Sequence, residues 1–323
     1  MKKFVLKWAC FILSICLLTI CLLTMSFGSC AGVADPKGDG VLTVVATNFA
    51  GYDFARQMLK DVPDGEVHLT LLGKAGQDMH DFEPTAADIT ALSSADVLIC
   101  LGSTAEIWLD AALKSAMNEH VIRVEMMAVC ETMEEDHSGH NHAEGESCSS
   151  LIGADEHVWL SPKNAIVIAK AIGEALCKAD AANSERYAAA AGAYGKELEA
   201  LWQAYLDMKA GAVRDTIVIA DRYPFAYLMR DLGLTCHAAF PGCSSETSAS
   251  FATQTFLIEK TKELALPCIF MIEGSDGKVA SVVAAETGTE VLTLNSIQVV
   301  TDRSVTYIDI MKGNLDALKK ALA

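Results

Sequence analysis

Two short segments of this chain each place one histidine a few residues before a proline-marked helix start. The first segment, residues 76–84, contains His80, and the second, residues 155–162, contains His157. The hydrophilic stretch between them holds three more histidines, His137, His140 and His142. Five of the eight histidines in the whole chain therefore lie in these three places. Imidazole is a common ligand of transition metals, and the pattern therefore favours metal binding over organic catalysis.

Each of the two segment histidines stands in a loop ahead of a predicted helix. Thr85 with Asp88 forms a near capping box, and Ser161-Pro162 supplies a capping serine and a proline at the first helical position. The positive end of a helix disfavours imidazolium and so favours the neutral ring that a metal needs. A single loop histidine is usually a surface residue, but two in matching contexts indicate a shared site. We expect both to ligate a metal ion.

The N-terminus has the features of a targeting segment. Three lysines precede an apolar run over residues 9–27, and small residues then lead to Cys30. We interpret residues 1–29 as a signal peptide and Cys30 as a lipidated mature N-terminus, although Phe27 departs from the usual lipobox. The alternative is an uncleaved anchor, because the run approaches membrane-spanning length. Either reading places the folded part outside the cytoplasm, at the outer face of a bacterial cell membrane.

Charge and cysteine content narrow the class of protein further. After residue 29 the chain carries 22 basic and 42 acidic side chains, a net charge of −20, which argues against nucleic-acid binding. Seven cysteines remain after residue 30, so intramolecular disulfides cannot pair them all. Cys130 and Cys148 flank the histidine-rich stretch and could close its base. Residues 131–150 have almost no apolar side chains, and we expect a surface loop there.

Short apolar runs alternate with helical patterns in both halves of the chain and predict an α/β fold. The expected strands are residues 41–47, 66–72, 96–101, 121–124, 216–220, 234–239, 268–272 and 290–294. Four strands in each half, separated by helices, predict two lobes, each with a mainly parallel sheet.

The centre of the chain lacks strand signals and reads as helix. One helix is predicted from Pro162 to about residue 178, and a second, with an amphipathic stripe of more than twenty residues, follows from Asn183 or Ser184. A helix of this length can serve as a stiff linker. We expect an N-terminal lobe over residues 30–182, a linker helix over 183–211 and a C-terminal lobe over 212–323.

The two histidine segments also carry a family resemblance. Asp78-Met79-His80-Asp81-Phe82-Glu83-Pro84 and Asp155-Glu156-His157-Val158-Trp159-Leu160-Ser161-Pro162 resemble the zinc/manganese solute-binding proteins of bacterial ABC importers. The resemblance continues through residues 223–227, 240–247 and 306–315, and so covers nearly all of the mature chain. It implies two α/β lobes joined by a long rigid helix, one metal-binding histidine from each motif, and a histidine-rich loop of the kind found in zinc members.

The resemblance is weaker at the other expected ligand positions. Arg222 stands where many members have a histidine or glutamate, and arginine cannot ligate a metal. Asn295 aligns with a final aspartate, and its amide oxygen would be a weak ligand. Three ways of completing the set of metal ligands stay open. A carboxylate could reach in, with Glu246 ahead of Asp221; loop histidines could fold over the site; or Arg222 could bring a bridging anion. The alternative for Glu246, equally favoured, is a carboxylate at the start of a helix. The alternative for Asp221 is a loop residue paired with Arg222.

The leading functional prediction is an extracytoplasmic, monomeric protein that captures Zn²⁺, or less favourably Mn²⁺, and delivers it to the permease of an ABC importer. The main alternative is an adhesin or interaction lipoprotein of the same fold with a weakened metal site. A metallohydrolase would need an open metal position beside a general base, and the chain has no His-Glu-x-x-His motif. We expect no enzymatic activity, and a structural role for Glu273.

Overall fold

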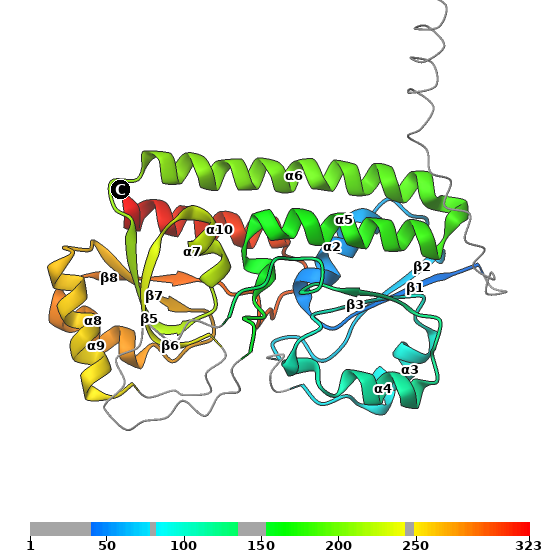
Figure 1. Cartoon of the computed structure of the whole chain (residues 1–323), viewed down its shortest axis with the longest axis horizontal. Coiled ribbons are helices and arrows are strands. Elements are labelled where there is room, and N and C mark those ends of the chain that lie inside the picture. The colour runs from blue at the N-terminus through cyan, green and yellow to red at the C-terminus, as the bar shows by residue number, and fades with distance from the viewer. Residues whose placement is uncertain (1–39, 78–81, 135–152, 243–248) are drawn as a thin grey trace, which may run out of the picture. The chain divides into compact units, whose positions relative to one another are not determined.

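The N-terminal sheet is formed by four parallel strands in the order β2-β1-β3-β4 in this computed structural model (Figure 1). The structure describes residues 40–77, 82–134, 153–242 and 249–323. The strands are β1 (Leu42–Ala46), β2 (Val67–Leu71), β3 (Val97–Cys100) and β4 (Ile122–Glu125). Every residue of β3 is buried, as expected for a central strand of a parallel sheet with both faces covered. The covering helices are α2 (Phe49–Leu59), α3 (Ala86–Ser94), α4 (Leu109–Ala116) and α5 (Pro162–Ala179).

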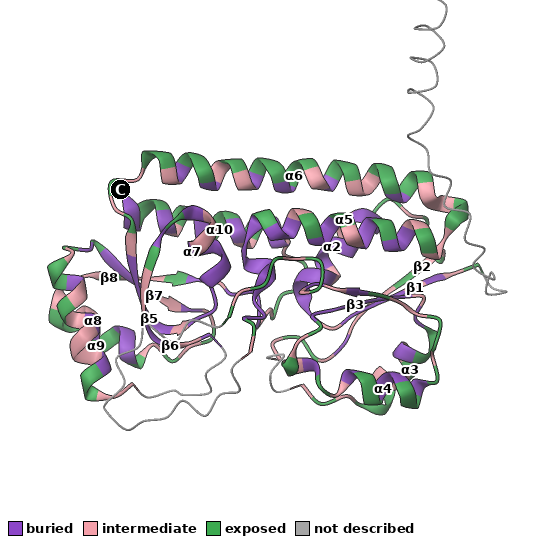
Figure 2. Cartoon of the chain, viewed as in Figure 1, coloured by how far each residue is buried: buried purple, intermediate pink, exposed green. Residues whose placement is uncertain are grey.

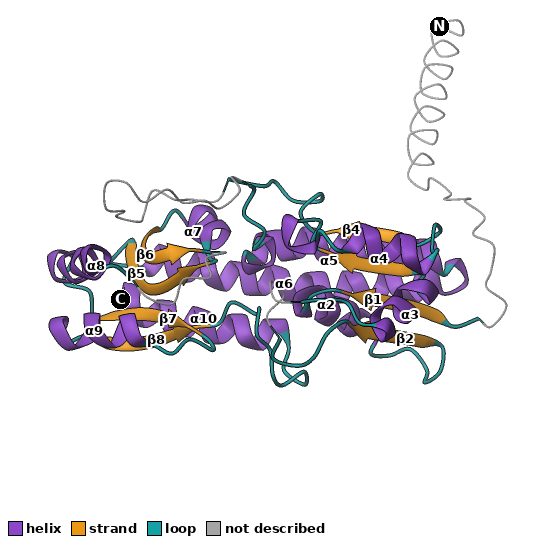
Figure 3. Cartoon of the chain, turned by 90° about the horizontal axis from the view of Figure 1, so that it is seen from below, coloured by secondary structure: helices purple, strands orange, loops and turns teal. Residues whose placement is uncertain are grey.

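The C-terminal sheet repeats this topology. Its strands lie in the order β6-β5-β7-β8 and are also parallel. They are β5 (Thr216–Tyr223), β6 (Thr235–Pro241), β7 (Cys268–Ile272) and β8 (Glu290–Leu294), with helices α7 (Ala226–Leu232), α8 (Phe251–Glu263), α9 (Lys278–Thr287) and α10 (Tyr307–Leu322). Figure 3 shows helices beside the strands of both sheets. The predicted fold class, two α/β lobes with parallel four-stranded sheets, is confirmed.

The predicted long linker helix is α6 (Ser184–Gly211), a single element of 28 residues. At 1.5 Å per residue it is about 42 Å long. Its buried side chains recur every three, four or seven residues and form the predicted amphipathic stripe: Tyr187, Tyr194, Leu198, Leu201, Tyr205 and Met208. This stripe lies against α5 and α10, and much of the remaining surface of α6 is exposed (Figure 2).

Local capping signals place the starts of α3 and α5 where the sequence predicts them. The Thr85 side chain accepts a hydrogen bond from the Asp88 backbone N–H, and the Asp88 carboxylate accepts one from the Thr85 N–H. At the start of α5 the Ser161 side chain accepts a hydrogen bond from the Asn164 backbone N–H, and Pro162 occupies the first turn. Both starts follow the loops that carry the two predicted metal-binding histidines.

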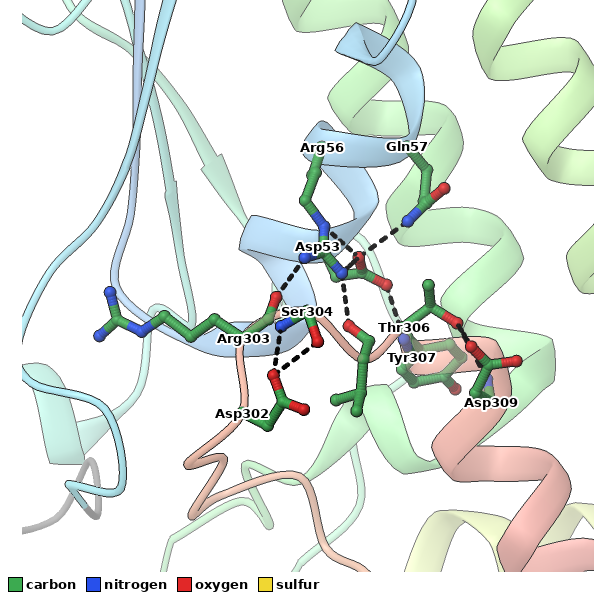
Figure 4. Close-up of polar contacts among 10 residues, drawn as sticks. Asp53, Arg56, Gln57, Asp302, Arg303, Ser304, Thr306, Tyr307 and Asp309 are labelled. Atoms are coloured by element: carbon green, nitrogen blue, oxygen red, sulfur yellow. Dashed lines mark hydrogen bonds and ion pairs between the residues drawn. The ribbon is translucent and has the colours of Figure 1, made fainter.

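Helix α10 is fastened to α2 by a buried carboxylate. Asp53, whose side chain is 0% exposed, accepts hydrogen bonds from the backbone N–H of Tyr307 (2.6 Å) and from Gln57 (3.0 Å). Arg56 pairs with Asp53 and also donates to the carbonyls of Arg303 and Val305 (Figure 4). Because Tyr307 is the first residue of α10, the Asp53 charge also lies at the favourable end of that helix.

None of the helices in the described ranges is long and apolar enough to cross a membrane. The predicted signal segment, residues 1–29, and Cys30 lie outside the described residues.

Asp53→Asn tests the link between α2 and α10. The amide keeps the shape but removes the charge that Arg56 and the start of α10 share, so the free energy of unfolding should fall by about 2–4 kcal/mol. Urea denaturation with the linear extrapolation measures it.

The matched control is Glu66→Gln, which removes an exposed ion pair with Arg186. Such pairs contribute at most about 1 kcal/mol, so this variant should be nearly neutral. Equal, small effects of both substitutions would show that the buried network does not hold α10 in place.

Candidate metal centre

His157 is completely buried, and its ring is oriented by the residue two positions before it. The Nδ1 atom lies 3.0 Å from the Asp155 carboxylate, which also accepts the backbone N–H of His157 at 2.8 Å. A carboxylate only accepts hydrogen bonds, so Nδ1 of His157 carries a proton and donates it to Asp155. This is the arrangement in which an outer carboxylate prepares a histidine to ligate zinc through its other nitrogen.

The segment that carries His157 is held by residues of the C-terminal lobe. The Tyr227 hydroxyl donates to the Asp155 carbonyl (2.6 Å), and burial raises the pKa of Tyr227 to about 12, so the hydroxyl keeps its proton. The Trp159 indole donates to the Ser296 carbonyl (3.0 Å), and the Tyr307 hydroxyl donates to the Trp159 carbonyl (2.7 Å). The histidine therefore has a fixed position between α7, the loop after β8 and the start of α10.

The Nε2 atom of His157 faces Gln298, a residue that the sequence analysis does not single out. The Gln298 Nε2 atom lies 2.6 Å from it, and the Gln298 side chain is 7% exposed. The only signal in the sequence is a polar residue shortly after a predicted strand, which many loop residues share.

The loop after β8 is organised by Glu273. Its two carboxylate oxygens accept the backbone N–H and the hydroxyl of Ser296, at 2.7 and 2.6 Å. Burial raises the pKa of Glu273, although the hydrogen bonds from Ser296 oppose the rise. Asn295 closes the turn, because its amide oxygen accepts the N–H of Ile297 (2.8 Å), and Ile297 has a positive φ of 63°. In this structure Asn295 supports the loop that presents Gln298.

Asp221 lies near the end of β5 and is engaged by backbone groups. One of its oxygens accepts the N–H of Arg222 (2.8 Å) and the other accepts the N–H of Ile272 on β7 (3.4 Å). The side chain is 8% exposed, and the register between β5 and β6 shifts at this point. These contacts give Asp221 a place in the sheet independent of any metal.

Several predicted site residues lie outside the described residues, so their geometry is not part of the site described above: His80, Glu246, His137, His140 and His142. Within residues 40–77, 82–134, 153–242 and 249–323, no cluster of three or more histidine, cysteine, aspartate or glutamate residues could hold a metal ion. Of the predicted imidazole ligands, the structure thus describes His157.

A pocket opens next to Gln298 at the carboxyl end of the N-terminal sheet. Its walls come from the β1–α2 connection, the residues after β2, the segment before α5 and the loop after β8: Asn48, Gly73, Phe82, Trp159, Gln298 and Arg303. Parallel α/β sheets bind ligands at this edge. The described neighbours of the 78–81 segment, Gln77 and Phe82, line the same pocket.

Gly242 lies against the His157 ring from the β6 side. A Cβ at this position would lie 2.9 Å from the Tyr223 carbonyl oxygen and 3.1 Å from Cε1 of His157. Gly242→Ala should therefore displace the ring or the β5 backbone and lower the free energy of unfolding by about 1–3 kcal/mol. Urea denaturation gives the stability, and an NMR correlation spectrum of the imidazole nitrogens gives the ring position.

Gly192→Ala is the control, because Gly192 lies in α6 with nothing within 4 Å of an added Cβ. An alanine there should stabilise the helix by about 0.5–1 kcal/mol. If Gly242→Ala were also neutral or stabilising, the close approach to His157 would not constrain the site.

Comparison with known proteins gives consistent matches over the whole described chain. A family model described as the periplasmic component A of a zinc-uptake complex matches residues 44–321. The high-affinity zinc uptake system protein ZnuA of Bacillus subtilis is 33% identical over 321 residues, which are 98% of each chain.

Two solved structures have the same fold. The metal-dependent lipoprotein YcdH from Bacillus subtilis is 30% identical with a TM-score of 0.71, covering 87% of this chain and 99% of that one. The Zn(II)-bound ZnuA-like domain of Streptococcus pneumoniae AdcA is 26% identical with a TM-score of 0.70, covering 88% and 99%.

Proposed function

We propose that this chain, which belongs to the family of zinc-uptake complex component A, binds Zn²⁺ outside the cytoplasm and passes it to the permease of an ABC importer. The observation that carries the proposal is the hydrogen bond from His157 Nδ1 to Asp155, which directs Nε2, the nitrogen that a metal would use, away from the carboxylate. Imidazole favours zinc over manganese, so Mn²⁺ is the second choice of cargo.

His157 is the ligand that the described geometry supports, and the other ligands are proposals from the sequence. Zinc takes about four nitrogen, sulfur or oxygen ligands. His80 and Glu246 are proposed first, because an imidazole and a carboxylate complete a common zinc set with His157. Asp221 and Asn295 rank below them, since their side-chain oxygens already accept backbone hydrogen bonds.

The proposed cycle contains no catalytic step. The protein would take up the ion, carry it to the membrane and release it, which requires binding that is tight but reversible. Lipidation at Cys30 would hold the chain at the outer face of the membrane. We propose that the protein acts there as a monomer. Its relatives include a metal-dependent lipoprotein, and lipidation of this chain is proposed from residues 28–30.

Substitutions at His157 and Asp155 test the proposed site. His157→Ala removes a ligand, and Asp155→Asn keeps the ring but replaces the charged acceptor of the Nδ1 proton with a neutral amide oxygen. Calorimetric titration of the chelator-treated protein with Zn²⁺ should show a weakening of about 10- to 100-fold for Asp155→Asn and a larger one for His157→Ala.

His120→Ala is the matched control, because His120 is an exposed histidine outside the motifs. It should leave zinc affinity unchanged. The proposal fails if the unaltered protein takes up no Zn²⁺ at micromolar concentrations, or if His157→Ala binds as well as His120→Ala.

The histidine-rich stretch is proposed as a weaker, collecting site. Replacing His137, His140 and His142 together with alanine should remove low-affinity zinc uptake and leave the single tight site intact, because imidazoles spaced two and three residues apart hold a metal only loosely. The stoichiometry from the same titration measures this. A loss of the tight site would instead make these histidines part of the main metal centre.

The runner-up function is an adhesin or interaction lipoprotein of this fold. Two observations favour it: the Gln298 side chain lies against Nε2 of His157, and arginine stands at position 222. Growth in zinc-poor medium separates the two: substitution of His157 should impair growth if the chain delivers zinc, and should have no effect if it serves only adhesion.

A further inference from the structure

The outer edge of the N-terminal sheet is open at β4. This strand is the last in the order β2-β1-β3-β4, and no described strand lies on its far side (Figure 3). The backbone N–H groups of Ile122 and Met126 donate to carbonyls on the β3 side, at 2.9 and 2.8 Å. Because backbone groups of successive strand residues face opposite ways, the N–H groups of Arg123 and Glu125 point outward. An outward row of this kind can pair with one more strand.

A groove runs along this edge, between β4 and the second half of α5. Its volume is about 400 Å³, within the range of ligand sites. One wall is β4 with the turn that follows it, and the other is one face of α5: Ala171, Glu174, Ala175 and Lys178. At 3.3 Å per residue, the four residues of β4 extend about 13 Å, so a strand of similar length fits beside them.

The two sides of the edge differ in chemistry. On the α5 side, Val124 and Ala175 belong to one buried core, and Ala171 packs against it. On the opposite side, Arg123 pairs with Asp110 on α4 at 3.1 Å. A strand that pairs with β4 therefore needs apolar side chains toward α5 and charged side chains toward α4.

Carboxylates outnumber cations around this groove. Arg123 is shared between Asp110 and Glu125, and Glu174 stands on the α5 wall beside Lys178. The three acidic side chains are 84%, 39% and 70% exposed, in that order, and can therefore meet a partner. After residue 29 the chain carries 22 basic and 42 acidic side chains. A second copy would bring the same net negative charge and be repelled, whereas a basic segment is attracted.

We propose that this groove binds an extended, basic segment of another polypeptide as a fifth strand of the N-terminal sheet. The bound segment pairs its backbone with β4, places apolar side chains against Ala171 and Ala175, and turns lysine or arginine side chains toward the carboxylates. In strand addition the main-chain hydrogen bonds give affinity and alternate side chains give specificity. The groove shares no lining residue with the pocket beside Gln298, and the proposal does not depend on zinc delivery.

Fluorescence anisotropy with short labelled peptides tests the site. A peptide of alternating valine and lysine should bind the purified protein saturably below about 1 mM, and added salt should weaken the binding. A peptide of alternating valine and glutamate should bind at least about ten-fold more weakly, because its charges are repelled. A valine–lysine peptide methylated on its backbone nitrogens should not bind, since it cannot donate to the Arg123 carbonyl.

Two substitutions on α5 locate the binding. Ala171→Phe fills the groove, so the valine–lysine peptide should bind at least about ten-fold more weakly. Glu174→Lys reverses one exposed carboxylate and should weaken the binding about two- to five-fold at low salt. The matched controls are Ala193→Phe and Glu199→Lys, which make the same changes at exposed positions of α6 and should leave the affinity unchanged.

Several outcomes would overturn the proposal. They are no saturable binding of the valine–lysine peptide, equal binding of its methylated form or of the valine–glutamate peptide, and equal binding by Ala171→Phe and Ala193→Phe. Sedimentation that shows a dimer of the unaltered protein, lost in Ala171→Phe, would assign the groove to a second copy instead. Because Glu174 is exposed, Glu174→Lys should fold normally and keeps the test valid if Ala171→Phe does not. Zinc affinity should be the same in all four variants, so a failure here leaves the proposed function in place.

Discussion

The hydrogen bond between the Asp155 carboxylate and Nδ1 of His157 is the interaction on which the account of this site depends. It places a proton on Nδ1 of a fully buried ring and leaves Nε2 facing the rest of the site. Asp155 is itself positioned by the Tyr227 hydroxyl, so the C-terminal lobe determines the chemistry of a residue that precedes α5.

The fold supplies this geometry through connections that are long in sequence. The loop after β8 reaches His157, and Trp159 and Tyr307 fasten the same region from either side. The buried pairing of Asp53 and Arg56 then holds the start of α10 against α2. Each of these contacts buries a polar group with a partner, which is the condition under which buried polar groups stabilise a structure. The surroundings of His157 are thus held by several buried hydrogen bonds between segments far apart in the sequence.

Local signals were sufficient to predict the elements of the fold. The caps at Thr85 and Ser161 depend on side chains within three residues, and the stripe of α6 depends on helical spacing, so each can be read from neighbouring residues. The alternation of apolar runs and helices likewise predicted two parallel sheets. Such patterns follow from the periodicity of helices and strands, so they can be recognised without knowledge of the tertiary contacts.

The contact partners within the site could not be predicted in this way. Asn295 and Gln298 both follow β8, and nothing in their spacing tells which one reaches His157. The difference arises from the turn, in which Asn295 accepts the N–H of Ile297 and a positive φ redirects the chain. Glu273 gains its role only because β7 and β8 are neighbours in the sheet. These are consequences of tertiary packing between residues far apart in sequence.

Anomalous diffraction at the zinc absorption edge, from a crystal of the zinc-loaded protein, shows directly whether His157 ligates the ion. One strong anomalous peak is expected about 2.0–2.1 Å from Nε2 of His157, with Nδ1 still hydrogen-bonded to Asp155. A protein that shows no peak at His157, or that holds zinc only along residues 137–142, would contradict it.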